Sequence, residues 1–291
     1  MTDESIRSVA VIGAGTMGHG IAQVCAMAGF GVSLHDPLPG RVEAALATIR
    51  GTLDKGVARG KVDEATRTSA LAILQEAAGL EDAVRDADLV IEAVPERLEL
   101  KTALFADLAR HAPARAVLAT NTSSLSVSRI GEATDRPGRV VGLHFFNPVH
   151  IMRLLEVVRG RETSDETLAA SLAFARRIGK EPIVVTDTPG FASSRLGVAL
   201  GLEAMRMVEE GVASPADIDR AMELGYNHPM GPLKLTDLVG LDVRLGIAEY
   251  LHGELGGDQY RPPELLRRMV AQGKLGKKSG QGFYDWTEEG R

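Results

Sequence analysis

The sequence has little of several features that define special classes of protein. Cys25 is its one cysteine, which excludes an intramolecular disulfide and a zinc site made of cysteines. Aromatic residues make up only 4% of the chain, and no apolar run reaches the roughly 18 residues that a transmembrane helix needs. Basic residues are also few, since 33 Lys and Arg stand against 39 Asp and Glu. The formal charge of −6 excludes the strongly basic surface of a typical nucleic-acid-binding protein.

What is present is typical of a globular protein. Hydrophobic residues make up 44% and charged residues 25% of the 291 residues, a length that favours two domains. The opening segment MTDESIRSVAVIG carries acids where a signal peptide would have a basic region and then an apolar core. We therefore expect a cytoplasmic protein without a membrane segment, a bound metal or a nucleic-acid partner.

Residues 1–186 alternate short apolar runs with amphipathic ones. Runs typical of buried strands are SVAVIG, GVSLHD, ADLVIEAVPE, AVLATNTSS, RVVGLHFFNP, LLEVVRG and, last, IVVTDTPG, and helical patterns follow the first three. This alternation predicts an α/β fold, a Rossmann-like doubly wound and mostly parallel sheet. After the break at Pro189-Gly190 only helical patterns remain, one of them with Ser214 as N-cap and Pro215 in its first turn. Residues 187–291 are therefore predicted to form an all-helical domain.

A glycine-rich turn joins the first predicted strand to the first predicted helix. Its residues fit the pattern G-x-G-x-x-G: Gly13, Ala14, Gly15, Thr16, Met17 and Gly18. In this position the first glycine permits the turn, the second admits a pyrophosphate to the backbone, and the third lets helix and strand pack closely. The pyrophosphate would then meet the free N–H groups of the helix N-terminus. The alternative is a glycine-rich turn that binds nothing.

Asp36 ends the second predicted strand, close to the spacing of a carboxylate that binds the ribose 2′-hydroxyl of a dinucleotide. A 2′-phosphate would be repelled there, so the sequence favours NAD over NADP. Arg41 is near in sequence but lies five residues further on, past two prolines. Asp36 remains open to a second interpretation, as a solvated acid in a turn.

His144 follows the apolar run RVVGL, at the carboxyl end of a predicted strand, where catalytic groups of such sheets lie. Glu156 lies within the next apolar run, LLEVV, where a carboxylate is costly unless it has a partner. Neighbouring strands would bring the two together, so that the carboxylate orients the imidazole and leaves its other nitrogen free to take a proton. The alternative is a structural histidine, which is how we interpret the other six.

Seven segments together resemble one enzyme family in order and spacing: GAGTMG, EAVPE, NTSSL, GLHFFNP, TDTPGF, HPMGPL and GKKSGQGFYDW. The sequence resembles the 3-hydroxyacyl-CoA dehydrogenases over nearly its whole length, most closely the single-function 3-hydroxybutyryl-CoA dehydrogenases. The resemblance implies an NAD-binding domain over residues 1–186 and a helical domain over residues 187–291 for dimerisation and substrate binding. It also implies oxidation of L-3-hydroxyacyl-CoA, of short chain, to 3-ketoacyl-CoA by NAD in fatty-acid metabolism, by a homodimer.

The resemblance also implies roles for individual residues. His144 would be the general base and Glu156 its orienting partner. Ser123 would lie near the substrate hydroxyl and the nicotinamide, and Asn147 on the nicotinamide side. Three further residues would contact the cofactor, one of them also the CoA: Glu96, Lys101 and Lys278.

A basic cluster follows the second predicted helix in this otherwise acidic chain. Its members are Lys55, Arg59 and Lys61, which would attract the nucleotide phosphates of CoA; Thr52 and Arg59 also resemble family contacts to CoA. The alternative is a solvated helix end, since cations there also complement the helix dipole. One departure is Ser194, which stands where the family usually has an asparagine facing the substrate carbonyl. A hydroxyl offers one donor where an amide offers two, which puts the fine geometry of substrate binding in doubt.

Two other functions stay open at this point. One is a related NAD-dependent hydroxy-acid dehydrogenase that does not use CoA, of the L-gulonate type, which the basic cluster argues against. The other is a non-catalytic NAD-binding protein that keeps the fold. The joint presence of His144, Glu156 and Ser123 argues against that second alternative.

Overall fold

The computed structural model describes residues 6–287 and divides the chain into two compact units between Asp187 and Thr188. The expected boundary was one residue earlier. Among the described residues, no helix has the length and apolar character to cross a bilayer. The two units are considered separately below.

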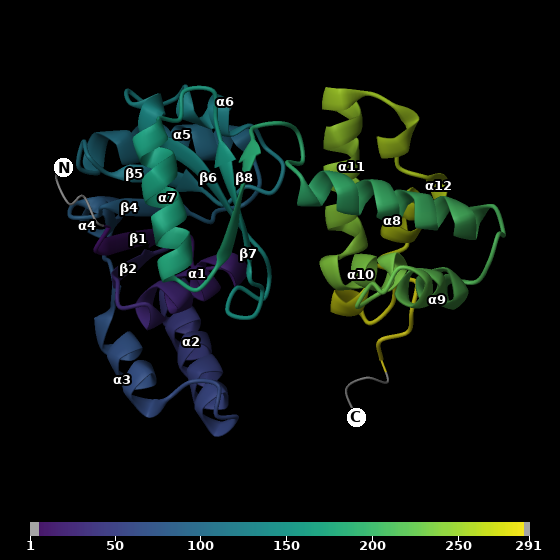
Figure 1. The fold of residues 1–291 in the computed structure, drawn as a ribbon, viewed down its shortest axis with the longest axis horizontal. Helices are drawn as coiled ribbons and strands as arrows, with labels where there is room; N and C mark the ends of the chain where they lie inside the picture. Colours follow the sequence, from purple (N-terminus) through teal and green to yellow (C-terminus); the bar gives the residue numbers. More distant parts are fainter. Residues whose placement is uncertain (1–5, 288–291) are drawn as a thin grey trace. The chain divides into compact units, whose positions relative to one another are not determined.

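The first unit contains an eight-stranded sheet in the order β3-β2-β1-β4-β5-β6-β7-β8 (Figure 1). Its strands are β1 (Ser8–Ile12), β2 (Gly31–His35), β3 (Leu74–Glu76), β4 (Leu89–Glu92), β5 (Val117–Thr120), β6 (Val140–Phe145), β7 (Leu154–Arg159) and β8 (Glu181–Thr186). Strands β4, β5 and β6 are buried throughout, which is what a sheet covered on both faces requires. The mostly parallel α/β fold expected from the sequence is confirmed.

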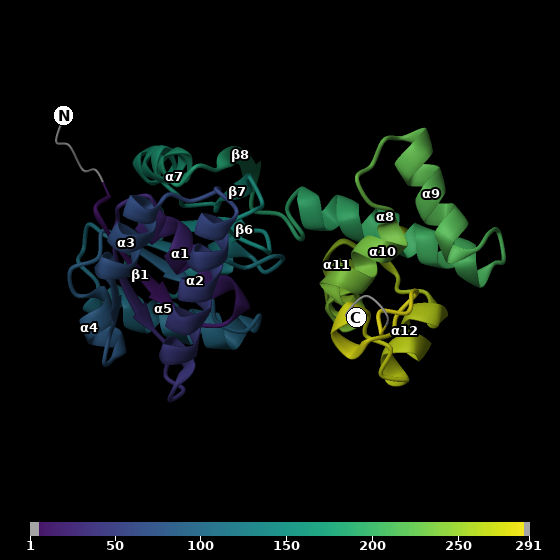
Figure 2. The ribbon, with the colours of Figure 1, turned by 90° about the horizontal axis from the view of Figure 1, so that it is seen from below.

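Helices cover both faces of this sheet (Figures 1 and 2). They are α1 (Thr16–Met27), α2 (Arg41–Ala58), α3 (Glu64–Ile73), α4 (Leu80–Val84), α5 (Leu98–His111), α6 (Val127–Gly131) and α7 (Asp165–Arg177), with a 3₁₀ turn at Pro137–Arg139. Val9 and Val11 share one core cluster with residues of α1, α2, α3 and α7. Because successive strand residues face opposite sides, Ala10 and Ile12 look toward the other layer, where Phe105 of α5 is buried.

Strand β7 runs antiparallel to β6, whereas β7 and β8 are parallel to each other. The reason lies in the connections. Residues 146–153 between β6 and β7 are too few for a crossover helix, so the chain must turn back. Helix α7 provides a full crossover between β7 and β8, and that pair is parallel. Strand β3 and helices α3, α4, α6 and α7 were not predicted from the sequence.

The second unit is helical, as expected. Its helices are α8 (Ser193–Glu209), α9 (Pro215–Gly225), α10 (Pro232–Val239), α11 (Leu241–Leu255) and α12 (Glu264–Ala271), with 3₁₀ turns at Asp258–Tyr260 and Lys277–Ser279. Ser214 caps α9 by accepting the N–H of Asp217, and Pro215 occupies the first turn. A separate core gathers Val198, Leu202 and other apolar residues of this unit. Each unit therefore has its own hydrophobic core.

Two buried aspartates hold the C-terminal segment onto the helices of this unit. Asp237 accepts hydrogen bonds from the backbone N–H of Phe283 and Tyr284 and from the indole of Trp286, at 2.9, 2.9 and 2.8 Å. Asp219 accepts the hydroxyl of Tyr284 at 2.7 Å. The aromatic residues of GFYDW thus anchor the segment.

Candidate active site

The residues singled out from the first 186 positions lie mainly after strands that run in one direction. The glycine turn follows β1, Asp36 follows β2, Glu96 follows β4, and Ser123 follows β5, while His144 is near the end of β6. Strands β2, β1, β4, β5 and β6 are parallel neighbours, so their carboxyl ends share one edge of the sheet. This is the edge at which open α/β sheets bind ligands.

The glycine turn has the geometry that a dinucleotide requires. Gly13 has φ +104°, and a side chain there would begin 2.6 Å from the carbonyl oxygen of Ala93. A side chain at Gly18 would begin 1.7 Å from the carbonyl oxygen of Gly13, so α1 packs on β1 only because both residues are glycine. Above Gly15, by contrast, there is open space. The turn therefore leaves its backbone open to a ligand at the N-terminus of α1.

Asp36 is tied to the glycine turn. Its carboxylate accepts the N–H of Ala14 at 2.9 Å and, through the other oxygen, the N–H of Leu38 at 3.0 Å. The carboxylate is half-buried and held beside the turn that would bind a pyrophosphate. This is a suitable place for an acceptor of ribose hydroxyls and an unfavourable one for a 2′-phosphate.

His144 and Glu156 face each other across β6 and β7. They are direct partners in the antiparallel register, and Nδ1 of His144 lies 2.7 Å from Oε2 of Glu156. Glu156 is fully buried and His144 is 6% exposed. The ring of Phe146 packs on the imidazole with its centroid 4.5 Å away. The contact expected from the sequence is present, and the carboxylate is positioned to fix the imidazole with Nδ1–H donated to it.

Glu96 links the loop after β4 to the loop after β5. Its Oε1 accepts the hydroxyl of Thr122 at 2.6 Å and the N–H and hydroxyl of Ser123 at 2.8 and 3.2 Å. Burial alone would raise the pKa of Glu96, but the Lys101 ammonium and these hydrogen bonds outweigh burial and hold the pKa below its usual value. An ionised carboxylate therefore orients Ser123 at the sheet edge.

Lys101 lies behind this contact and is only 1% exposed. Its ammonium is 2.6 Å from Oε1 of Glu92 and 3.3 Å from Oε2 of Glu96. The sequence comparison had implied a contact of Lys101 with cofactor and CoA. The buried ammonium is engaged by two carboxylates and holds Glu96, and a contact of Lys101 with cofactor or CoA stays a prediction.

Glu92 is a residue of this site that the sequence analysis missed. It is fully buried at the end of β4, and it accepts the N–H of Val94 and the hydroxyl of Thr120, both at 2.7 Å, besides the Lys101 ammonium. The cost of a carboxylate in a buried strand, which singled out Glu156, would have singled out Glu92 equally.

Two asparagines lie near the carboxyl end of β6, one just after β5 and the other just after β6. Asn121 accepts the N–H of Phe145 through its Oδ1 at 2.9 Å, which ties the loop of Ser123 to the strand of His144. Asn147 is exposed just after the strand, available to a ligand.

The basic cluster lies at the C-terminal end of α2. Lys55, Arg59 and Lys61 are exposed, and within residues 6–287 none of the three forms an ion pair with a carboxylate. Thr52 instead donates its hydroxyl to the carbonyl of Thr48 at 2.9 Å. Three unneutralised cations so close together suit an anionic ligand, and they also complement the helix dipole.

Ser194 and Lys278 belong to the second unit. Ser194 is half-buried in the first turn of α8. The Lys278 ammonium lies 2.5 Å from the carboxylate of Asp242 and is partly exposed. No group of His, Cys, Asp and Glu side chains in residues 6–287 is arranged to hold a metal ion.

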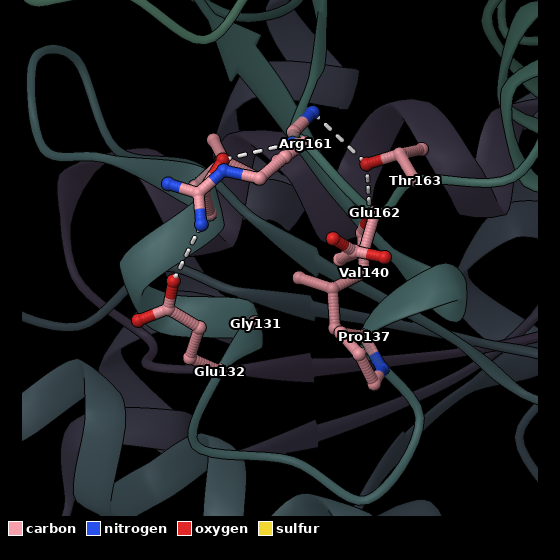
Figure 3. Close-up of a pocket in the computed structure, with 10 residues that line it drawn as sticks. Gly131, Glu132, Pro137, Val140, Arg161, Glu162 and Thr163 are labelled. Carbon is pink, nitrogen blue, oxygen red and sulfur yellow. Dashed lines mark hydrogen bonds and ion pairs between the residues drawn. The ribbon is translucent and has the colours of Figure 1, made fainter.

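Two hollows of the first unit contain none of these candidates. One of about 110 Å³ lies beside Val140, at the amino end of β6 and hence at the opposite edge of the sheet, with the Arg161–Glu132 ion pair on its wall (Figure 3). The other, of about 290 Å³, is lined by the C-terminal half of α1 and by the segment between β6 and β7. It includes Lys180, whose ammonium is bound by the carbonyls of Val149 and Met152.

Comparison with protein families finds two matching domains that together span nearly the whole chain. The NAD-binding domain of 3-hydroxyacyl-CoA dehydrogenase matches residues 8–188, and the C-terminal domain of 3-hydroxyacyl-CoA dehydrogenase matches residues 190–286.

Individual proteins give the same result. A probable 3-hydroxybutyryl-CoA dehydrogenase of Bacillus subtilis is 47% identical over 284 residues, which cover 98% of this chain and 99% of that protein. The crystal structure of an (S)-3-hydroxybutyryl-CoA dehydrogenase from Ralstonia eutropha is 42% identical, with a TM-score of 0.93 over 98% of this chain and 100% of the other. A diketoreductase is 33% identical, with a TM-score of 0.85 over 98% and 99% of the two chains.

Proposed function

The chain belongs to the 3-hydroxyacyl-CoA dehydrogenase family of NAD-dependent oxidoreductases, and on that premise we propose that it oxidises short-chain L-3-hydroxyacyl-CoA, such as (S)-3-hydroxybutyryl-CoA, to the 3-ketoacyl-CoA. The observation that carries the proposal is the buried His144–Glu156 pair at the ligand-binding edge of the sheet.

His144 acts as the general base on the C3 hydroxyl. Its Nδ1–H is donated to Glu156, so Nε2 is the ring nitrogen that can take the hydroxyl proton. Once the proton is taken, the imidazolium lies beside a buried carboxylate that stabilises its charge. Such a base contributes about 10² to 10⁴ to the rate.

The glycine turn and Asp36 would hold NAD, which when bound would supply the acceptor for the hydride that leaves C3. Ser123 stabilises the developing charge on the substrate oxygen. Its hydroxyl is a single donor with a long bond of 3.2 Å to Glu96, which it can exchange for the substrate oxygen while its N–H keeps the 2.8 Å bond. Asn147, which is exposed after β6, would lie on the nicotinamide side.

The CoA phosphates are bound by Lys55, Arg59 and Lys61 at the end of α2, with Thr52 beside them. This basic cluster distinguishes the proposed activity from that of an L-gulonate-type dehydrogenase, whose substrate carries no phosphate. It also distinguishes the proposed activity from a diketoreductase-like activity on substrates without CoA.

A substrate comparison tests the proposal. We expect NADH from (S)-3-hydroxybutyryl-CoA and NAD, little reduction of NADP, and no turnover of free 3-hydroxybutyrate or L-gulonate. Turnover of a free acid at a similar kcat/KM would contradict the proposal that the substrate is a CoA thioester. NAD binding without turnover of any acyl-CoA would favour a non-catalytic protein.

A homodimer through the second unit belongs to the same proposal. Several large apolar side chains of that unit are exposed, including Leu196 and Leu224, each 72% exposed, and Tyr226, 75% exposed. Apolar side chains so exposed on one helical unit are suited to an isologous interface. A cytoplasmic location stays a prediction of the sequence, which cell fractionation would test.

A further inference from the structure

Lys180 is a buried cation that the proposed mechanism does not use. It lies between the end of α7 and the start of β8, and its residue is only 8% exposed. Within residues 6–287 no carboxylate lies within ion-pair distance of its ammonium, and the carboxylate of Glu181, the next residue, engages Arg153 instead. Burial lowers the pKa of Lys180, which reflects the cost of keeping a charge there.

The ammonium is bound instead by two backbone carbonyls of residues 146–153, the segment that joins β6 to β7. It donates to the carbonyl oxygens of Val149 and Met152, the second at 2.6 Å. Both carbonyls lie outside helices and strands, and within residues 6–287 no other donor reaches either of them. Lys180 therefore satisfies two acceptors that would otherwise have no partner in the protein.

The backbone around Lys180 is itself firmly held. The N–H of Lys180 donates to the carbonyl of Ala175 at 2.9 Å, directly after Gly179, which ends α7 with φ +74°. The N–H of Glu181 donates to the carbonyl of Arg153 at 2.8 Å. The ammonium thus connects the segment to a fixed junction between α7 and β8.

Val149 is held from a second direction as well. A side chain at Gly20 of α1 would begin 2.9 Å from the side chain of Val149, which is only 2% exposed. The side chain of Val149 therefore packs closely on α1, while its carbonyl accepts from Lys180. Loss of the ammonium would leave the side-chain packing in place but would release the backbone of the segment.

The same segment carries two residues that bear on the active site. Phe146, three residues before Val149, packs its ring on the imidazole of His144 with the centroids 4.5 Å apart. Asn147, two residues before Val149, is exposed after β6, where it would meet the nicotinamide. A residue spans at most about 3.6 Å of chain, so the backbone at Val149 and both of these residues are closely linked.

We propose that Lys180 is a positioning residue of the dehydrogenase reaction, which holds the carbonyls of Val149 and Met152 and thereby sets the places of Phe146 and Asn147. This inference rests on the proposed function and deepens it, because it adds a residue that none of the sequence motifs singled out. A misplacement of about 1 Å in such an alignment can lower a rate about 100-fold.

The first test is Lys180→Ala, measured as NADH formation from (S)-3-hydroxybutyryl-CoA in a single turnover with enzyme in excess. We expect the rate constant to fall by about 10- to 100-fold. The dissociation constant for NAD should stay within about threefold, because the glycine turn and Asp36 are untouched. Arg176→Ala, which removes an exposed cation three residues before Gly179, is the control and should change neither value.

Rescue by an added amine tests whether the donated hydrogen bonds matter. Propylammonium has the three carbons and the ammonium that Lys180→Ala removes, and Lys180 lines the hollow of about 290 Å³ through which an amine can enter. We expect propylammonium to restore much of the rate of Lys180→Ala in a saturable way. Tetramethylammonium, with the same charge but no N–H, should restore nothing. Equal effects of the two cations, or no effect of either, would overturn the inference.

Thermal unfolding separates positioning from a purely structural role. Lys180→Met keeps the unbranched side chain and its packing but donates no hydrogen bond, and its rate should fall as in Lys180→Ala at temperatures well below its Tm. A Lys180→Met enzyme with a lowered Tm, but with the wild-type single-turnover rate while folded, would assign Lys180 to structure alone and contradict the proposal.

Failure of the inference and failure of the proposed function give different results. A wild type that forms NADH from (S)-3-hydroxybutyryl-CoA, with Lys180→Ala and Lys180→Met equally fast, overturns the role of Lys180 alone. A wild type that binds NAD but forms no NADH from this thioester overturns the proposed function.

Discussion

His144 and Glu156 are separated by 12 positions in the sequence but lie 2.7 Å apart at the edge of the sheet. Two local arguments were enough to single them out, the end of a predicted strand for His144 and the cost of a buried carboxylate for Glu156. The same cost applies to Glu92, whose partner Lys101 comes from α5. Which carboxylate would be paired with which cation depends on three-dimensional packing, so the burial of Lys101 was not predictable from its place in the sequence.

Ser194 is the residue at which this chain departs from its family's pattern, and its contribution to catalysis should be small. Ser194→Ala should lower kcat/KM for 3-hydroxybutyryl-CoA by about tenfold at most, because a single neutral hydrogen bond is worth about 0.5–1.5 kcal/mol. Steady-state kinetics checks this, with Ser193→Ala as the neighbouring control. A loss as large as that of His144→Ala would show that Ser194 has a direct part in the chemistry.

At the scale of elements, the order of strands and helices followed from the sequence better than their directions. The apolar runs predicted β1, β2 and β4–β8, but the reversal of β7 depends on the shortness of residues 146–153, which the run pattern alone did not bring out. β3 is too short and too exposed to produce an apolar run. The reversal is what places Glu156 directly opposite His144.

Glu96 joins the loops after β4 and β5 through hydrogen bonds to Thr122 and Ser123. These hydrogen bonds should depend on pH, because the Lys101 ammonium affects the pKa of Glu96. The pKa of Glu96 is lowered in the folded protein, so its bonds to Thr122 and Ser123 are intact above the unfolded pKa and are lost as the pH falls through the folded value. In Lys101→Met the pKa of Glu96 should rise. We therefore expect the acid limb of the kcat/KM profile to move to higher pH.

A double variant separates this effect from loss of stability. Lys101→Met alone leaves Glu92 as a buried charge without its cation and should lower the free energy of unfolding by about 3–5 kcal/mol. Adding Glu92→Gln should recover much of that stability without restoring the acid limb. An acid limb that stays at the wild-type pH in Lys101→Met would disprove the coupling.

The C-terminal segment is the second element whose attachment can be tested. Asp237→Asn replaces one of the two acceptor oxygens with an amide group that cannot accept from Phe283, Tyr284 or Trp286. We expect a loss of about 1–3 kcal/mol in the free energy of unfolding, measured by denaturant titration. Because Trp286 is the only tryptophan, its fluorescence reports the segment directly. Asp285→Asn, on the same segment, changes a carboxylate that accepts hydrogen bonds from Thr287; it is the control and should leave the midpoint unchanged.

For the whole molecule, the sequence predicted two domains, and the chain divides within one residue of the expected boundary. Composition alone showed a net acidic chain; the positions of Lys55, Arg59 and Lys61 showed a local cationic surface within it. Arg244 is buried in α11, and its Nε has no hydrogen-bond partner among residues 6–287. It had no signal in the sequence, because a single arginine among apolar residues is usually an exposed position.

A homodimer should be visible in light scattering coupled to size exclusion. We expect a mass twice that of the monomer, and a shift toward the monomer mass when Leu196→Glu and Leu224→Glu are combined in the second unit. Leu38→Glu, at an exposed apolar position of the first unit, is the matched control and should leave the mass unchanged. A wild type that is a monomer at low micromolar concentration would rule out the proposed dimer.

The most direct test of the central claim is a single-turnover measurement of NADH formation from (S)-3-hydroxybutyryl-CoA with enzyme in excess. If His144, held by Glu156, takes the hydroxyl proton, His144→Ala should form NADH about 10² to 10⁴ times more slowly than the wild type. The dissociation constant for NAD should stay unchanged, because the glycine turn and Asp36 are untouched. NADH formation at the wild-type rate in His144→Ala would contradict the account.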